Sequence, residues 1–321
     1  MKVNLQDSKI GGCVVCGEHG HRFLFNSSEV RHGMKGSWKI FRCEHCGLYS
    51  LFPVPKDLSK YYPKDYTAYY DYEVGDLPNY KKLGLKKYYG YSHLPCKDSL
   101  RESLKAFGYF IFTRLNGSKI IPFQKGILYD VGAGSGEFLA SQKKLGWEVL
   151  GVDFSKYGCA FAKKKGVKVF CGDYLDFSLP KKAAVINATF ILEHVKEPNA
   201  FFKKAAEELR TGGMLVFDVP NSNALDLALF KNNCYALDSP RHLFVFNKKN
   251  LSMLLSKHVF KLLRVTYTKS PFHFIKSINL WLKCRGHNFQ FSTSNKLFYP
   301  LTLLLGLLGL SCELTVFAVK E

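Results

Sequence analysis

The stretch Asp130-Val131-Gly132-Ala133-Gly134-Ser135-Gly136 decides the fold, because it joins an apolar run at 127–131 to a helical pattern that begins at Glu137. A glycine-rich turn between a strand and a helix lets a ligand approach the backbone closely and presents free N–H groups at the helix start. A nicotinamide-dinucleotide fingerprint, G-x-G-x-x-G, would require glycine where Glu137 stands. The spacing G-x-G-x-G therefore predicts a small-molecule site of a different kind at the end of this strand.

A regular alternation of strands and helices follows the turn. Short apolar runs predict strands, and apolar residues spaced three and four apart predict helices. Strands are expected at 127–131, 148–152, 167–171, 183–188, 213–219, 260–267 and 313–319, and helices at 137–145, 156–165, 198–210 and 248–258. Such alternation is typical of βαβ units, in which helices cover both faces of a parallel sheet. The predicted fold class is α/β, with a doubly wound sheet.

Two acidic residues stand at the ends of the next two strands. Asp153 closes the second strand, where a carboxylate can accept both hydroxyls of a ribose. Asp173 follows the third strand, where it can face an adenine edge. Because the carboxyl ends of parallel strands lie at one edge of a sheet, we expect the glycine-rich turn and both acids to form one site.

These residues, in this order, resemble the class I S-adenosylmethionine-dependent methyltransferases. The matching motifs are DVGAGSG at 130–136, GVD at 151–153, GD at 172–173, FILEHVKEP at 190–198 and KKAAEELRTGGMLVFDVPN at 203–221. The resemblance implies a Rossmann-like sheet of seven strands with the last strand antiparallel, and S-adenosyl-L-methionine bound above the carboxyl ends of the strands. It extends to a subgroup that carries an N-terminal CxxC…CxxC ribbon and includes sugar and surface-polysaccharide methyltransferases.

The resemblance also implies roles for individual residues. The methionine part of the cofactor would be surrounded by Asp130, Gly132, Gly134 and Gly136. Asp153 would bind the ribose hydroxyls, and Asp173 with Tyr174 would border the adenine. The fourth strand departs mildly from the family pattern, since Asn187, Ala188 and Thr189 stand where relatives often carry a more apolar run. The end of this strand is therefore left open.

Two histidines are candidates for the catalytic base. Methyl transfer needs an aligned acceptor and, for a hydroxyl or carbon acceptor, removal of a proton. His194 is the first candidate, with Glu193 orienting it or contacting the cofactor; the alternative is that His194 only packs against the cofactor. His242 is the second candidate, with a capping or core role as its alternative. Next to it, Arg241 either pairs with a substrate phosphate or is a solvated charge.

Four cysteines have the spacing of a metal site. Two C-x2-C pairs, Cys13 with Cys16 and Cys43 with Cys46, can arrange four thiolates around a structural Zn²⁺ ion. A redox pair or a ribbon that has lost its metal are the alternatives. The remaining cysteines occur singly, which favours reduced thiols over a disulfide framework; they are Cys96, Cys159, Cys171, Cys234, Cys284 and Cys312.

The predicted organisation has three segments. A zinc-ribbon-like domain is expected over 1–52, a tyrosine-rich linker and helical lid over 53–125, and the methyltransferase domain over 126–321. An amphipathic helix is expected over 98–116. The tyrosines at the start of the linker either resemble the lid residues of the subgroup or only pack; they are Tyr61, Tyr62, Tyr66, Tyr69 and Tyr70.

The formal net charge of +20 comes from the two ends of the chain. Residues 126–230 hold 13 basic and 12 acidic side chains, whereas 231–321 hold 13 and 3. A charge of this size favours an anionic partner such as a nucleic acid, an anionic membrane or a phosphorylated substrate. The apolar stretch 297–310 is too short to span a bilayer, so it either lies on an anionic membrane or is a buried helix.

Three functions were weighed on this basis. We expect an enzyme that methylates a sugar, a glycan precursor or a related small or lipid-linked metabolite, in the cytoplasm or at the inner face of the membrane, since no secretory signal is visible. A nucleic-acid methyltransferase is less favoured, because the fourth strand is not followed by the [ND]PP[YF] tetrapeptide that stacks a flipped base. The third is a non-catalytic zinc-ribbon adaptor, and the intact series of cofactor motifs argues against it.

Overall fold

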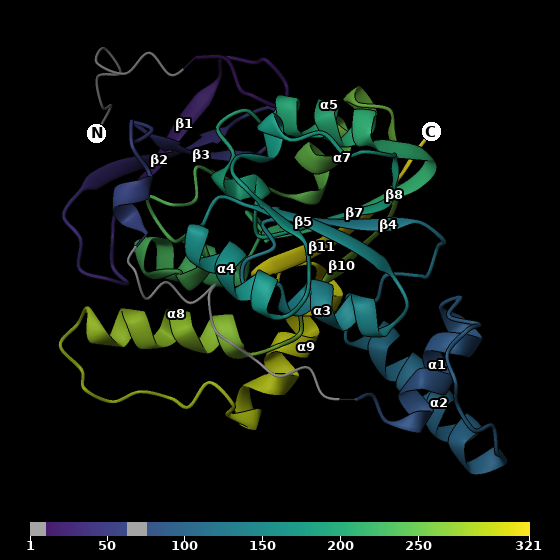
Figure 1. The fold of residues 1–321 in the computed structure, drawn as a ribbon. Helices are drawn as coiled ribbons and strands as arrows, with labels where there is room; N and C mark the ends of the chain where they lie inside the picture. Colours follow the sequence, from purple (N-terminus) through teal and green to yellow (C-terminus); the bar gives the residue numbers. More distant parts are fainter. Residues whose placement is uncertain (1–10, 63–75) are drawn as a thin grey trace.

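The computed structural model describes residues 11–62 and 76–321, and its centre is a seven-stranded sheet (Figure 1). The strand order is β10-β11-β8-β7-β4-β5-β6. The strands are β4 Ile127–Val131, β5 Glu148–Asp153, β6 Val169–Cys171, β7 Ala183–Thr189, β8 Leu209–Pro220, β10 Phe260–Tyr267 and β11 Glu313–Lys320. The last strand, β11, is antiparallel to both β8 and β10. The predicted α/β fold with an antiparallel last strand is confirmed.

The two faces of the sheet are buried under different elements. All five residues of β4 are buried, and they alternate between two apolar clusters, so that Tyr129 lies in one and Leu128 in the other. Strands buried on both faces carry near-continuous apolar runs, which is why the sequence pattern located them. The predicted helices are present as α3 Glu137–Lys144, α4 Lys156–Lys164, α5 Pro198–Glu208 and α7 Lys248–Lys257.

A second, four-stranded sheet contains the N-terminal segment. Its order is β1-β2-β3-β9, with β1 His21–Ser28, β2 Ser37–Cys43, β3 Tyr49–Phe52 and β9 Phe244–Val245. The strand β9 comes from the chain that follows β8, and it pairs antiparallel with β3. The backbone N–H of Leu51 also donates to the carbonyl of Leu243 over 2.9 Å. The first and third predicted segments therefore share a sheet.

Five further helices lie around this core. They are α1 Asn79–Tyr88, α2 Leu100–Leu115, α6 Leu225–Phe230, α8 Phe272–Lys283 and α9 Tyr299–Leu308. The predicted helix over 98–116 is confirmed by α2, which begins where Ser99 accepts a hydrogen bond from the backbone N–H of Glu102. It packs through the face that carries Ala106 and Thr113, and its apolar stripe is exposed. Within the described ranges, no helix is long and apolar enough to cross a membrane.

One prediction about the cysteines is wrong. Cys159 and Cys171 form a disulfide, with their Cα atoms 6.1 Å apart, instead of being single thiols. The two come together because β6 pairs in parallel with β5 and places Cys171 opposite Asp153, beside the first turns of α4. The other four cysteines that were expected as thiols are unlinked.

Candidate functional site

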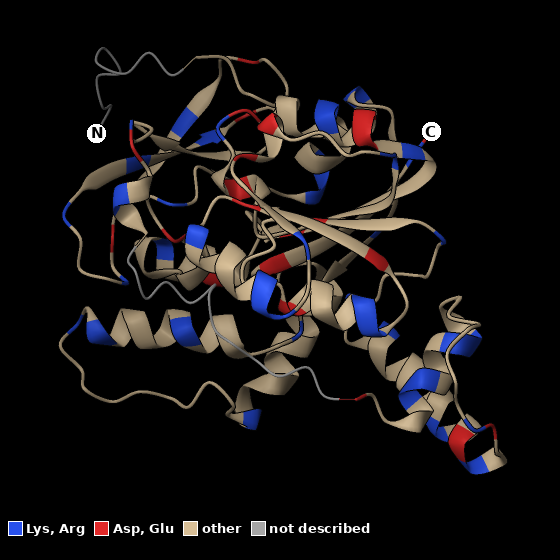
Figure 2. Cartoon of the chain, viewed as in Figure 1, with Lys and Arg blue, Asp and Glu red and all other residues tan. Residues whose placement is uncertain are grey.

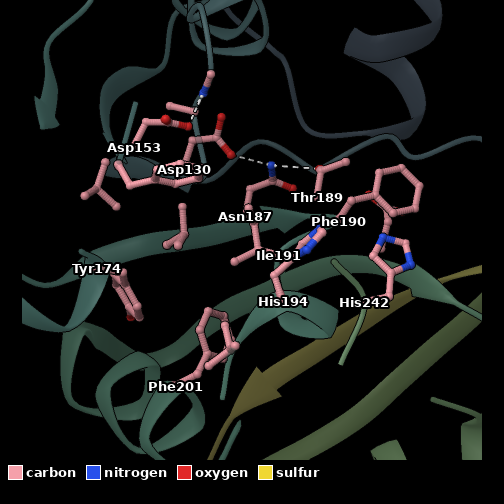
Figure 3. A pocket seen from close by; sticks show the side chains of 18 of the residues that line it. Asp130, Asp153, Tyr174, Asn187, Thr189, Phe190, Ile191, His194, Phe201 and His242 are labelled. Atoms are coloured by element: carbon pink, nitrogen blue, oxygen red, sulfur yellow. Dashed lines mark hydrogen bonds between the residues drawn. The ribbon is translucent and has the colours of Figure 1, made fainter. Parts of the chain in front are cut away.

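The candidate site lies where the strand order of the main sheet reverses. β4 is flanked by β5 on one side and by β7 on the other, and ligands of open α/β sheets bind at such a reversal, outside the carboxyl ends of the strands. A pocket of about 1170 Å³ occupies this position. Figure 3 shows the carboxylates of Asp130 and Asp153 at one end of the pocket and the rings of His194 and His242 at the other.

The glycine-rich turn forms the floor of the pocket. Gly132 has a φ of +76°, where other residues are strained, and a Cβ atom placed on it would lie 2.0 Å from Cδ1 of Ile191, so a side chain there would also displace Ile191. The backbone N–H of Gly132 donates to the carbonyl of Val152 over 2.8 Å, which ties the turn to β5. Gly136, also at positive φ, is the N-cap of α3. The predicted glycines therefore leave backbone surface, and not side chains, facing the pocket.

Two buried carboxylates stand beside this turn. Asp153 accepts hydrogen bonds from the backbone N–H groups of Gly134 and Ser155, each over 2.8 Å. A carboxylate has about four acceptor positions, so Asp153 keeps capacity for a ligand. Asp130 accepts a 2.7 Å hydrogen bond from Nδ2 of Asn187, and burial raises its pKa to about 7. Asn187, which looked like a departure from the family pattern, thus positions Asp130.

The residues after β5 and β6 form the rim of the pocket. Asp173 lines it and caps the 3-10 turn Tyr174–Asp176 by accepting from the backbone N–H of Leu175. Tyr174 borders the pocket, but its ring lies 5.4 Å from that of Phe201, and only 7% of the residue is exposed. Its main contacts are therefore with the core.

Phe154 is a rim residue that the sequence analysis missed. It follows Asp153 directly, is 61% exposed and lines the pocket. Its ring centroid lies 5.7 Å from that of Tyr62. Large exposed rings at a pocket rim provide a surface on which a planar group can stack. An aromatic residue directly after the acid that closes a strand was the available signal.

His194 lies in the pocket wall, and its ring is held by two contacts at Nδ1. Its Nδ1 atom lies 2.9 Å from the carbonyl oxygen of Arg241 and 2.9 Å from the hydroxyl of Tyr62. A carbonyl only accepts, so Nδ1 carries the proton and the lone pair is on Nε2. Burial lowers the pKa of His194 below its ordinary value, so the neutral ring is favoured at pH 7. Tyr62, one of the predicted lid tyrosines, therefore contacts His194, whereas Tyr61 packs on Trp38.

Glu193 is next to His194 in sequence but faces His242. Both carboxyl oxygens of Glu193 are buried and have no hydrogen-bonding partner among the described residues. Nε2 of His242 lies 3.8 Å from Oε1 of Glu193, and Nδ1 of His242 lies 2.9 Å from the carbonyl of Ala236. Burial raises the pKa of Glu193 well above its ordinary value, and burial beside His194 lowers the pKa of His242 to about 3. Tyr62 and Arg241, and not Glu193, hold His194.

Both predictions for Arg241 are wrong, since it is neither a substrate ligand nor a solvated charge. Its side chain is fully buried and donates to both oxygens of Asp238, to Glu29 and to the carbonyl of Tyr61. Burial alone would raise the pKa values of Glu29 and Asp238, but the bonds from Arg241 outweigh it and lower both. The sequence could not show this pairing, because Glu29 lies more than two hundred residues away.

Close polar contacts in the remaining pocket wall were also missed. Nζ of Lys119 contacts Asp218 and Thr189 at the ends of β8 and β7, and His273 of α8 pairs with Glu313 of β11. All five of these residues line the pocket. Both ends of the pocket therefore carry polar side chains, with carboxylates beside the turn and groups of both signs in the opposite wall.

The four predicted metal ligands come together in the N-terminal lobe, which comprises residues 11–52. Sγ of Cys13 lies 3.6 Å from that of Cys46, and Sγ of Cys16 lies 3.5 Å from that of Cys43. All four sulfur atoms lie within 4.8 Å of one another. A tetrahedral zinc site with Zn–S bonds of about 2.3 Å has S···S separations of about 3.8 Å, so this cluster has nearly the required size.

Comparison with known proteins gives one family. The sequence model of a methyltransferase-domain family, described as "Methyltransferase domain", matches residues 98–265, which is just over half of the chain. The ubiquinone biosynthesis O-methyltransferase of Nitrobacter winogradskyi is 31% identical over 108 residues, or 32% of this chain and 41% of that protein. Its counterpart in Bradyrhizobium sp. is 30% identical over 108 residues, or 32% and 43%. The chain thus spans less than half the length of these curated relatives.

Solved structures of methyltransferases also match, at lower identity. Magnesium protoporphyrin IX methyltransferase from Synechocystis PCC 6803 has a TM-score of 0.43 and 13% identity, covering 74% of this chain and 96% of that one. A SAM-dependent methyltransferase from Archaeoglobus fulgidus has a TM-score of 0.44 and 19% identity, covering 68% and 94%. Because these scores are low, the fold assignment rests on the strand order and the family match. On that evidence the chain belongs to the methyltransferase-domain family and has the class I, S-adenosylmethionine-dependent fold.

Proposed function

We propose that this protein transfers a methyl group from S-adenosylmethionine to a hydroxyl group of a sugar or glycan precursor. The observation that carries the proposal is the position of His194 in the wall of the pocket. Nδ1 of its ring is bound to the carbonyl of Arg241, which leaves Nε2 unprotonated. A neutral imidazole at the acceptor end is suited to remove the proton of a hydroxyl. The opposite end of the pocket, which we call the donor end, has the glycine-rich turn and the two acids with which this family binds S-adenosylmethionine.

The donor end fits S-adenosylmethionine by its size and chemistry. Asp153 has unused acceptor positions for ribose hydroxyls, and Phe154 and Leu175 supply exposed apolar surface at the rim for the adenine. Asp130 and the backbone at Gly132 and Gly134 would lie against the methionine part. When bound, this group supplies a methyl on a sulfonium sulfur, which leaves as a neutral thioether and needs no acid.

The residues of the acceptor end would then do two things. They would align the hydroxyl with the methyl group, and His194 would accept the hydroxyl proton as the oxygen takes the methyl. The products are a methyl ether, the thioether form of the donor and a protonated imidazole. Tyr62 and the carbonyl of Arg241 hold the ring, and the carbonyl stabilises the proton that Nδ1 keeps throughout.

Two features support a polar hydroxylated acceptor. The acceptor wall carries Arg31, Lys119, His273 and Glu313, which can hydrogen-bond to many hydroxyl groups, and the ring of Tyr62 can stack on a sugar. The curated relatives are named for O-methyl transfer in ubiquinone biosynthesis, and a hydroxyl acceptor is common to both chemistries. The resemblance to sugar methyltransferases favours the sugar.

The acceptor class is tested by labelling. The protein is incubated with methyl-labelled S-adenosylmethionine and with separated extracts of soluble sugars, lipids and nucleic acids. We expect the label in the fractions that contain soluble or lipid-linked sugars, as a methyl ether of a sugar hydroxyl. Label that appears only in nucleic acid would overturn the choice of acceptor, and the absence of any transfer with all extracts would count against the enzyme.

Replacing Asp153 by alanine should weaken cofactor binding about 10²–10⁴-fold, because two hydrogen bonds to a carboxylate contribute about 1.5–3 kcal/mol each. The dissociation constant is measured by titration calorimetry with S-adenosylmethionine. Asp176→Ala, at an exposed acid that ends the turn Tyr174–Asp176 and does not line the pocket, is the matched control and should leave affinity unchanged. Equal affinity in Asp153→Ala and wild type would contradict the assigned ribose contact.

We further propose that the four-cysteine cluster holds a structural Zn²⁺ ion. The sulfur separations agree with a tetrahedral site, and Gly17 and Gly47, both at positive φ, close the two turns through hydrogen bonds to the carbonyls of Cys13 and Cys43. The cluster would also support the pocket wall that contains His242, because Asn247 donates to the carbonyl of Gly47 over 3.2 Å and β9 pairs with β3.

Removing the zinc should impair turnover more than cofactor binding. In Cys13→Ser with Cys43→Ser, the β3–β9 contact loosens and His242 and Arg241 shift, and misplacing a catalytic group by about 1 Å costs about 100-fold in rate. The affinity for S-adenosylmethionine should change little, because its proposed contacts lie on the main sheet. The measurements are turnover, cofactor affinity and zinc content by mass spectrometry. A folded variant that binds no cofactor would argue against this separation.

A further inference from the structure

The exposed apolar side chains are concentrated on two helical segments. Among the described residues, twelve of the twenty-one exposed large apolar side chains belong to α2 or to residues 297–308. Single exposed apolar residues need no explanation, but a concentration of this size marks a contact surface. We call these twelve the apolar surface: Leu100, Leu104, Phe107, Ile111, Phe112, Leu115, Leu297, Tyr299, Leu301, Leu304, Leu307 and Leu308.

The two segments meet at one end. The hydroxyl of Tyr299 donates to Oδ1 of Asn116, directly after α2, and Nζ of Lys269 donates to the carbonyl of Leu115. In Figure 1, α1, α2, α8 and α9 all lie along the lower edge of the molecule, on the side away from β1 to β3. The two segments that carry the apolar surface therefore adjoin at one end and lie along the same edge of the molecule.

The exposed face of α2 has the pattern of a helix that lies in a membrane interface. Five of its six apolar residues recur at spacings of three and four, from Leu100 to Leu115. Basic residues flank this stripe: Arg101 and Lys105 lie on one side of it and Arg114 on the other, and all three are exposed. Helices that bind membrane surfaces combine an apolar stripe with lysine and arginine at its edges.

The charge on this side selects an anionic partner. Residues 239–312, which contain α8 and α9, hold eleven lysines and arginines and no aspartate or glutamate. Figure 2 shows basic residues on α8 and beside α9, and the exposed Lys283, Arg285 and Lys296 are in this stretch. A second copy of the chain would place one basic surface against another, which disfavours a dimer through this side.

We propose that α2 and residues 297–308 dock the protein on an anionic phospholipid surface. The apolar surface enters the boundary of the acyl chains, and the flanking basic side chains contact phosphate headgroups. This docking goes beyond the proposed function, since it holds whatever the acceptor is. His273 of α8 and Glu313 after α9 line the pocket, so the elements on this side of the molecule also carry one pocket wall.

Vesicle sedimentation with the whole chain tests the docking without any activity measurement. We expect binding to vesicles of phosphatidylcholine with phosphatidylglycerol, weak binding to phosphatidylcholine alone, and loss of binding as salt is raised. Two double variants test the two segments separately: Leu104→Glu with Ile111→Glu, and Leu304→Glu with Leu307→Glu. Each should weaken binding about tenfold or more, because each removes two apolar side chains that would be buried in the membrane.

A matched control and a second measurement keep the test decisive. Val259→Glu changes a side chain that is 54% exposed beside the C-terminal Glu321, at the opposite edge of Figure 1, and should bind as wild type does. Cofactor affinity shows that each variant is folded. The proposal is overturned if wild type ignores anionic vesicles, if the control loses binding equally, or if the substitutions abolish only a dimer seen by ultracentrifugation.

Discussion

His194→Ala should lower kcat by about 10²–10⁴-fold, the contribution of a positioned general base. The affinity for S-adenosylmethionine should stay near that of wild type, because no part of the imidazole is assigned to the donor end. Single-turnover transfer to the acceptor identified by labelling measures the rate, and calorimetry measures the affinity. His287→Ala, an exposed histidine after α8, is the matched control and should leave both unchanged.

The pH profile separates a base from a packing role for His194. A base acts in its neutral form, and burial holds the pKa of His194 below the ordinary value of about 6.5. The midpoint of the decline in turnover at acid pH should therefore lie below about 6.5, as the ring becomes protonated. If His194→Ala weakens cofactor binding and leaves kcat intact, His194 only packs. If His242→Ala alone abolishes turnover, the base is His242.

Arg241→Met should lower the free energy of unfolding by about 3–5 kcal/mol, the cost of leaving buried charges without their partner. The change removes the guanidinium from Asp238 and from Glu29, whose buried side chain also accepts from backbone N–H groups. Urea unfolding followed by tryptophan fluorescence gives the value. Arg22→Met, at an exposed arginine of β1, should cost less than about 0.5 kcal/mol.

The sign of the pH effect checks the cause of this loss. In wild type the pKa values of Glu29 and Asp238 are lowered, so their stabilisation is present above their unfolded pKa values and is lost as pH falls. In Arg241→Met the buried Glu29 gains stability by protonation, so the gap to wild type should narrow as pH falls. Adding Glu29→Gln to Arg241→Met should recover part of the loss. No recovery, with a gap independent of pH, would indicate that packing and not charge is responsible.

The main sheet and the donor end could be predicted from local patterns. The strands at 127–131 and 260–267 were predicted with their observed bounds. The first is buried along its whole length and is therefore almost continuously apolar, whereas the second is an edge strand that is recognisable by its β-branched and aromatic residues. The glycines of the turn were recognisable because only glycine avoids a collision at Gly132, and the four cysteines because their spacing is that of a metal site. Each of these signals lies within a few residues of its own position.

The acceptor end was predicted less well, since its contacts join distant parts of the chain. Glu193 was assigned to its neighbour His194, yet the turn at Leu192–His194 directs the two side chains differently, and Glu193 faces His242. Tyr174 was expected at the adenine, and its main contacts are with the core ring of Phe201. Of the five predicted lid tyrosines, Tyr66, Tyr69 and Tyr70 lie outside the described residues.

The sequence by itself determined the α/β fold, the order of the cofactor motifs and the four cysteines that cluster, because each depends on periodicity or spacing along the chain. Only the tertiary structure decided that Arg241 is buried between Glu29 and Asp238, that β9 joins the N-terminal lobe to the pocket wall, and that α2 turns its apolar stripe outward. The physical reason is that burial and charge pairing depend on which surfaces meet. A helix pattern shows that one face is apolar, but it does not show what covers that face.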